Sequence, residues 1–139
     1  MVNPSRRLGY VGRSSAQLIR TSNEMGNAIK VVAKAASVVL DFTDDCLTFP
    51  YRNSAGDEWE GCLDEWIGNG NPPNDYEQFA VELEGSRYYQ IGAAGGGADV
   101  VLVRDDAKGT ICYLNDMDQS VSEVSPNLDA FIASLRPPA

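Results

Sequence analysis

The second half of the chain alternates short apolar runs with polar turns, a pattern typical of a sheet built from hairpins. Strands are expected at four runs rich in β-branched or aromatic residues: 87–91, 98–104, 110–114 and 121–124. The run 98–104 is apolar at nearly every position and predicts a central strand. Three successive glycines, Gly95, Gly96 and Gly97, predict a tight turn before it, because glycine adopts positive φ without strain.

Apolar residues at helical spacing predict one helix near each end of the chain. The first begins at Ser14 or Ser15, ends near Ala36 and carries an apolar stripe: Leu18, Ser22, Met25, Ile29, Val32 and Ala36. The second begins with Ser125 as N-cap and Pro126 at its first position. Its stripe follows the i, i+3, i+4, i+7 pattern: Leu128, Phe131, Ile132 and Leu135. Both stripes are expected to pack on the sheet; for the first, a free face that binds a partner is the less favoured alternative.

Residues 57–68 (DEWEGCLDEWIG) predict a third, acidic helix in the middle of the chain. Its apolar face has helical spacing: Trp59, Cys62, Leu63, Trp66 and Ile67. Its opposite face carries five carboxylates: Asp57, Glu58, Glu60, Asp64 and Glu65. Two interpretations of these acids stay open, a solvated face favoured by the helix dipole and a docking surface for a basic partner.

The remaining segments are short. Residues 37–42 and 46–51 predict a hairpin, and Pro50 either places its second strand at the edge of a sheet or ends that strand. For residues 75–83, a helix capped by Asp75 and a strand both fit, because periodicity does not separate the two in so short a run.

Together these elements predict a single α+β domain over residues 15–139. It consists of a mostly antiparallel sheet of about five to six strands with an N-terminal helix, a middle acidic helix and a C-terminal helix. Residues 1–14 are expected to form a basic, flexible arm in front of this domain.

The order of elements from Arg87 to Leu135 (RYYQIGAAGGGADVVLVRDDAKGTICYLNDMDQSVSEVSPNLDAFIASL) resembles the C-terminal half of the SUKH superfamily. That superfamily groups bacterial immunity proteins with yeast cell-wall-synthesis regulators. Its Gly-Gly-Asp-type turn corresponds here to Gly96, Gly97 and Asp99, with Ala98 inserted. The resemblance covers about a third of the chain. It implies a protein that binds other proteins, and in the immunity role neutralises a toxin enzyme, often a nuclease, by covering its active site.

The charge of the chain is unevenly distributed. The net charge is −9, but residues 1–36 hold six basic residues and one acid, whereas residues 37–139 hold five basic residues and nineteen acids. Such an acidic body disfavours nucleic-acid binding and complements a basic protein such as a nuclease. The basic arm (Arg6, Arg7 and Arg13) is expected to be a mobile tail. Docking on an acidic protein is the main alternative, and contact with nucleic acid is a further one.

The composition also limits the chemistry. Without histidine, neither a Ser-His-Asp nor a Cys-His mechanism is possible, and no carboxylate pair stands out, so we expect no enzyme, no cofactor and no metal site. Three cysteines, Cys46, Cys62 and Cys112, with no secretory signal predict buried free thiols in a cytoplasmic protein. No apolar run reaches the length of about 20 residues that spans a membrane.

The favoured function is therefore a protein-binding module of the immunity type. The residues expected to contact a basic, toxin-like partner are seven acids: Asp57, Glu58, Glu60, Asp64, Glu65, Asp116 and Asp118. Trp59 and Trp66 are expected in the core first, and as anchors for the partner only if exposed. The alternative is a structural subunit of a phage particle or another large assembly, held by the basic arm.

Overall fold

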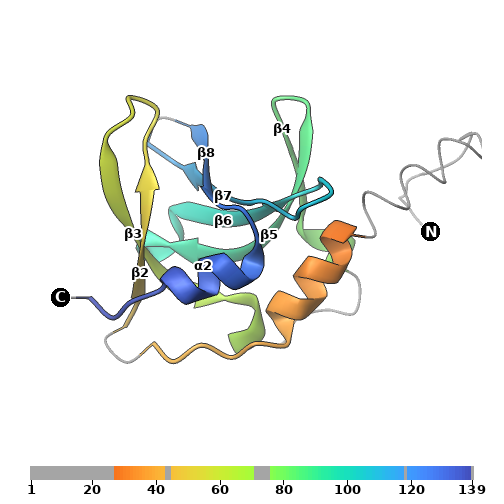
Figure 1. The fold of residues 1–139 in the computed structure, drawn as a ribbon, viewed down its shortest axis with the longest axis horizontal. Coiled ribbons are helices and arrows are strands. Elements are labelled where there is room, and N and C mark those ends of the chain that lie inside the picture. The colour runs from red at the N-terminus through yellow and green to blue at the C-terminus, as the bar shows by residue number, and fades with distance from the viewer. Residues whose placement is uncertain (1–26, 43–44, 71–75, 118, 139) are drawn as a thin grey trace, which may run out of the picture.

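The protein is built on one antiparallel sheet of seven strands (Figure 1). The computed structural model describes residues 27–42, 45–70, 76–117 and 119–138. The strands are β2 (Leu47–Arg52), β3 (Glu58–Trp66), β4 (Ala80–Leu83), β5 (Ser86–Ala94), β6 (Asp99–Arg104), β7 (Ile111–Asn115) and β8 (Ser120–Ser125). Their order is β2-β3-β5-β6-β7-β8, and β4 pairs with the first half of β5. The expected central strand at 98–104 is confirmed as β6, between β5 and β7.

The sheet curls until its two ends come together. β2 lies close to β8, and the rings of Tyr51 on β2 and Tyr113 on β7 are 4.5 Å apart. Thr48 exchanges two backbone hydrogen bonds with Arg136, with N···O distances of 2.7 and 3.0 Å. The result is an open barrel whose concave face holds the main core.

Two helices are present among the described residues, and both cover the concave face (Figure 1). The N-terminal helix, residues 27–36 as far as described, buries Ala28, Val32 and Ala35. The helix α2 (Leu128–Ser134) buries Leu128 and Phe131. Both stripes therefore pack on the sheet; the predicted start at Ser14 or Ser15 lies outside the described residues.

The fold class predicted from the sequence is wrong in its middle element. Residues 58–66 form strand β3 and not an acidic helix, so the sheet has seven strands rather than five or six. In a helix, the five carboxylates of this segment would repel one another without basic partners and would destabilise it. The strand separates them, and Glu58 pairs with Arg52 on β2 at 2.9 Å.

Gly61 shows why this segment is a strand. It lies opposite Phe49 in the β2–β3 pair, and a Cβ atom at Gly61 would stand 2.3 Å from Cζ of the Phe49 ring. The ring packs directly over the glycine backbone and is 1% exposed. Phe49 also contacts Tyr113 and Phe131, each at a centroid distance of 5.2 Å. The pairing with Phe49, twelve residues earlier in the chain, therefore outweighs the local helical spacing.

The segment 37–42 is not the predicted strand. It has no regular structure, and side chains satisfy its backbone: Leu40 N–H donates to Asn69 Oδ1 at 2.9 Å, and Asn69 Nδ2 donates to Leu40 O at 2.7 Å. Trp66 Nε1 donates to Val38 O at 3.0 Å. The second strand of the predicted hairpin exists as β2, and Pro50 does lie in a strand at the end of the sheet order.

Two smaller expectations are also settled. Residues 76–79 form a short 3-10 turn and residues 80–83 form β4, so the segment 75–83 contains a strand after a helical turn. The cap of α2 is Asn127, whose side chain accepts from Ala130 N–H at 2.8 Å, and not Ser125, which ends β8.

The expectation of three free thiols is wrong. Cys46 and Cys62 form a disulfide with a Cα–Cα distance of 5.6 Å, and only Cys112 is free and buried among the described cysteines. Cys62 lies opposite Thr48 in the β2–β3 pair, so the hairpin brings Cys46, two residues before Thr48, within reach. The cross-link ties the start of β2 to the middle of β3.

Replacing both Cys46 and Cys62 with serine should lower the free energy of unfolding by about 3 kcal/mol. The two cysteines are 16 residues apart in the sequence, and a cross-link that closes a loop of about 15 residues restricts the unfolded chain by about this free energy. Alkylation of the unfolded, unreduced protein should modify one cysteine, and three after reduction, as read by intact mass. Three modified cysteines without reduction would contradict the disulfide.

Gly61→Ala should destabilise the protein by about 1–3 kcal/mol, the usual cost of overpacking, because the buried Phe49 ring cannot move away freely. The matched control is Gly70→Ala, where a Cβ atom meets nothing within 4 Å and φ is −117°. Urea unfolding measures both variants. Equal midpoints for the two would show that the Phe49–Gly61 contact does not determine the position of β3.

Candidate functional site

The aromatic core of the barrel continues into an open cleft at one end. Phe49 and Tyr51 lie two residues apart on the same face of β2, and Trp59 is directly opposite Tyr51 on β3. Phe49 is buried, Tyr51 is half-buried, and Trp59 is 57% exposed. The β2–β3 hairpin thus extends beyond the core, and its last inward-facing rings reach solvent. The mouth of a barrel is a common place for a binding site.

This cleft, here named the Trp59 cleft, has a volume of about 480 Å³. One wall is the hairpin, with Tyr51, Asn53 and Trp59. The other wall comes from the glycine-rich turn with the start of β6 and from the β7–β8 turn; its members are Gly95, Ala98, Asp99, Asn115, Asp116 and Met117. Met117 is 93% exposed. The cleft therefore combines exposed apolar side chains with two carboxylates, and none of the described residues that line it is basic.

Asp99 belongs to the second wall, and hydrogen bonds within the protein hold its carboxylate in place. One of its oxygens accepts from the hydroxyl of Tyr113, and the other accepts from Asp116 N–H at 2.8 Å. Burial, followed by the hydrogen bond to Asp99 and the charge of Asp99, raises the pKa of Tyr113 well above its ordinary value. Tyr113 consequently stays a neutral donor, and Asp99 holds the β7–β8 turn in place.

Asp116 is exposed and less constrained. Its Oδ1 accepts a long hydrogen bond of 3.3 Å from Gln119 Nε2. No donor to Oδ2 is found within the described ranges. Asp116 therefore keeps acceptor capacity for a ligand.

The side-chain oxygens of the two asparagines in the cleft accept hydrogen bonds from the protein's own backbone. Asn53 Oδ1 accepts from Ala55 N–H at 3.0 Å and from Asp57 N–H at 2.9 Å. Asn115 Oδ1 accepts from Met117 N–H at 2.9 Å, and its Nδ2 donates to the hydroxyl of Tyr51 at 3.2 Å. These bonds shape the turns and use the amide oxygens, so the two amides keep little acceptor capacity for a ligand.

Asp64 positions the glycine-rich turn. It lies at the irregularity between Leu63 and Glu65 in the β3–β5 pairing, and its Oδ2 accepts from Gly96 N–H at 2.8 Å. Gly95, Gly96 and Gly97 have φ of 60°, 72° and 94°, a backbone that other residues rarely adopt. The expected turn is confirmed, and the carboxylate that holds it comes from β3.

The predicted site residues do not form one surface. On the strand, Glu58 is paired with Arg52 and Asp64 supports the turn, while Asp57, Glu60 and Glu65 are exposed. Asp116 lies in the Trp59 cleft. Asp118 and the arm residues Arg6, Arg7 and Arg13 lie outside the described residues.

Tyr51, Asp99 and Met117 were not among the predicted binding residues. The only signal that could have suggested them is the pair of aromatic residues at alternate positions of residues 46–51, continued across the hairpin by Trp59. Trp66, the other candidate anchor, is 4% exposed and belongs to the core.

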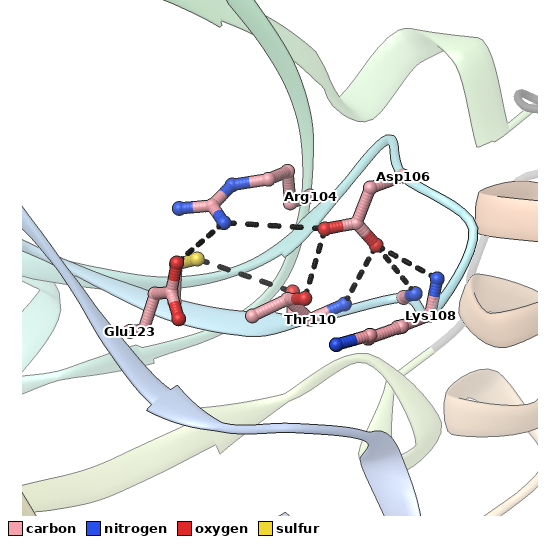
Figure 2. A network of polar contacts seen from close by, with 7 residues as sticks. Arg104, Asp106, Lys108, Thr110 and Glu123 are labelled. Atoms are coloured by element: carbon pink, nitrogen blue, oxygen red, sulfur yellow. Dashed lines mark hydrogen bonds and ion pairs between the residues drawn. The ribbon is translucent and has the colours of Figure 1, made fainter.

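A second polar cluster holds the β6–β7 turn (Figure 2). Asp106 Oδ1 accepts from the backbone N–H groups of Lys108, Gly109 and Thr110 at 3.0, 2.7 and 3.2 Å, and Oδ2 accepts from Thr110 Oγ1 at 2.8 Å. Arg104 pairs with Glu123 at 2.7 Å. These groups satisfy one another, so the cluster is structural.

The turn supports the N-terminal helix. Gly109 has φ of 67°, and a Cβ atom there would lie 2.7 Å from Cγ2 of Val31. Asn27 Nδ2 donates to Ala107 O. Asp106 therefore stabilises the surface on which this helix packs.

Within the part of the chain that the structure describes, no three cysteine or acidic side chains converge on a metal-sized site. Comparisons with protein-family models, with curated proteins and with solved structures give no match. The resemblance to the SUKH superfamily therefore stays a prediction.

Asp106→Asn should destabilise the protein by about 1–2 kcal/mol at pH 7, because it weakens charge-assisted hydrogen bonds. Burial opposes ionisation of Asp106, but the bonds from Thr110 and the backbone outweigh it and lower its pKa. A lowered folded-state pKa stabilises the fold above the ordinary carboxyl pKa of about 3.9, and this contribution disappears as pH falls through the folded value.

The difference between wild type and Asp106→Asn, measured by urea unfolding, should therefore shrink as pH falls from 7 toward 3. Thr110→Val is the matched variant: it removes one donor and leaves the carboxylate, so the pH dependence should persist. A difference between wild type and Asp106→Asn that is constant over this range would exclude the charge as its origin.

Proposed function

We propose that this protein is a non-catalytic protein-binding module that docks a basic surface of its partner on the Trp59 cleft. The observation that carries the proposal is the exposed Trp59 in a cleft that Tyr51 and Met117 also line. The cleft holds Asp99 and Asp116, and its lining has no basic side chain among the described residues. Aromatic residues and methionine are enriched at protein interfaces, and tryptophan and tyrosine often dominate their binding energy.

Charge supports a basic partner. The chain has a net charge of −9, and such a field accelerates association with a positive protein and suppresses acidic competitors. Together with the SUKH-like pattern of residues 87–135, this supports the immunity role, in which the partner is a basic, toxin-like enzyme such as a nuclease, whose cleft is positive for phosphate binding.

The disulfide bears on the cytoplasmic location that the sequence predicted. The disulfide between Cys46 and Cys62 favours an oxidising compartment, because reducing systems keep thiols free in the cytosol. Among the residues described, no helix is both long and apolar enough to cross a bilayer.

The test is capture of partners from lysate of the native host by the tagged full chain, with identification by mass spectrometry. A basic protein retained by wild type should be lost from Trp59→Ala. The matched control is Val39→Ala, which truncates another exposed apolar side chain, 75% exposed and outside the cleft. Retention by wild type and control, with at least tenfold loss for Trp59→Ala, is the expected result.

Deletion of residues 1–14 distinguishes docking on the Trp59 cleft from the alternative function, a subunit of a large assembly held by its basic arm. If binding disappears with the arm and persists in Trp59→Ala, the cleft is not the docking site, and the role as an assembly subunit anchored by Arg6, Arg7 and Arg13 replaces the proposal.

A further inference from the structure

We infer that the Trp59 cleft receives an arginine side chain of the partner, whose guanidinium stacks on the Trp59 ring and pairs with Asp116. This inference rests on the proposed function and specifies the ligand chemistry of the same cleft. Two observations support it: the groups of the cleft that remain available for a ligand, and the contacts that Arg87 and Arg104 make elsewhere in the protein.

The free binding capacity of the cleft suits a group that only donates. The side-chain oxygens of Asn53 and Asn115 are engaged in holding the turns. Both oxygens of Asp99 accept internal bonds. Among the described residues that line the cleft, the exposed ring of Trp59 and the Asp116 carboxylate offer an aromatic face and an acceptor. A guanidinium has five N–H donors and no acceptor, so it matches this pair.

At two other places in the protein, an arginine lies over an aromatic ring and pairs with a carboxylate. Arg104 lies over the Tyr88 ring at 5.8 Å and pairs with Glu123 at 2.7 Å. Arg87 lies over the Tyr89 ring at 5.6 Å and pairs with Glu77 at 2.5 Å. Each site thus consists of an aromatic ring, a carboxylate and an arginine that joins them.

The Trp59 cleft has an aromatic ring and a carboxylate, but no arginine joins them among the described residues. Over the described ranges, no arginine or lysine side chain lies over Trp59, and Arg52, the nearest in sequence on the same hairpin, is bound to Glu58 and Gly56 O, each at 2.9 Å. Tryptophan is the best aromatic partner for a cation, and the planar guanidinium stacks where a compact ammonium does not. Arginine therefore fits better than lysine.

The source is a protein partner rather than a small cation. The cleft is shallow enough that Met117, at its rim, is 93% exposed, so a ligand here also meets the exposed apolar rim. An arginine presented on a folded surface buries its stem against Met117 while its head reaches Asp116. A basic enzyme surface carries such arginines.

The experiment titrates three blocked tripeptides into the full-length chain: acetyl-Gly-Arg-Gly-amide, its lysine analogue and its citrulline analogue. The probe is the indole N–H signal of Trp59 in a nitrogen-15 NMR spectrum, assigned with Trp59→Phe. The arginine peptide should shift this signal saturably, the lysine peptide less, and the neutral citrulline peptide not measurably. Asp116→Asn should weaken the arginine peptide about tenfold, the effect of one charge-assisted hydrogen bond.

The matched control is Glu60→Gln, which removes the same charge from an exposed position outside the cleft lining; it should change the affinity less than twofold. Equal shifts with arginine and citrulline, or equal weakening by Asp116→Asn and Glu60→Gln, would overturn the inference. A signal that responds to the peptide only after deletion of residues 1–14 would also overturn it, because the chain's own arm would then be the occupant.

The two proposals fail differently. If a partner is captured in a Trp59-dependent manner but binds Asp116→Asn as tightly as wild type, the arginine is wrong and the docking function stands. If the arginine peptide binds as expected but no captured protein depends on Trp59, the ligand chemistry stands and the protein-binding function is wrong.

Discussion

The contact between Phe49 and the bare backbone of Gly61 determines how the rest of the molecule is arranged. Only a glycine lets the ring come so close to the β3 backbone, and the ring also contacts Tyr113 on the far strand β7 and Phe131 on α2. One side chain thereby joins the first hairpin, the end of the sheet and the C-terminal helix. Together with the contact between Tyr51 and Tyr113, it holds β2 against the β7–β8 end of the sheet.

The cleft is a consequence of that closure. Since Phe49 lies in the core, Tyr51 must lie two residues further along the same face, near the mouth of the barrel, and Trp59 must stand opposite it. The disulfide at Cys46 and Cys62 fixes the other end of the hairpin. The exposed tryptophan is therefore placed by the register of β2 and β3, and a slip of β3 by one residue would turn Trp59 to the outer face, away from Tyr51.

The sequence predicted the C-terminal half well because its signals are local. The strand β6 is a continuous apolar run bounded by glycines and aspartates, and α2 follows a proline and carries a regular stripe. The segment 57–68 failed because Trp59, Leu63 and Trp66 fit a helix by spacing. The deciding partner, Phe49, can be recognised only once the hairpin is known. The disulfide was missed for the same reason, since it depends on the hairpin that aligns Cys46 with Cys62.

The site was predicted less well than the fold, because charge alone does not distinguish a structural acid from a binding one. Asp64, Asp99 and Asp106 all accept backbone N–H groups and each holds a turn. Glu58, Glu77 and Glu123 are paired with arginines. Much of the negative charge that suggested a docking face is thus used within the fold. What distinguishes Asp116 is its place in a cleft with the exposed ring of Trp59, which only the curled sheet reveals.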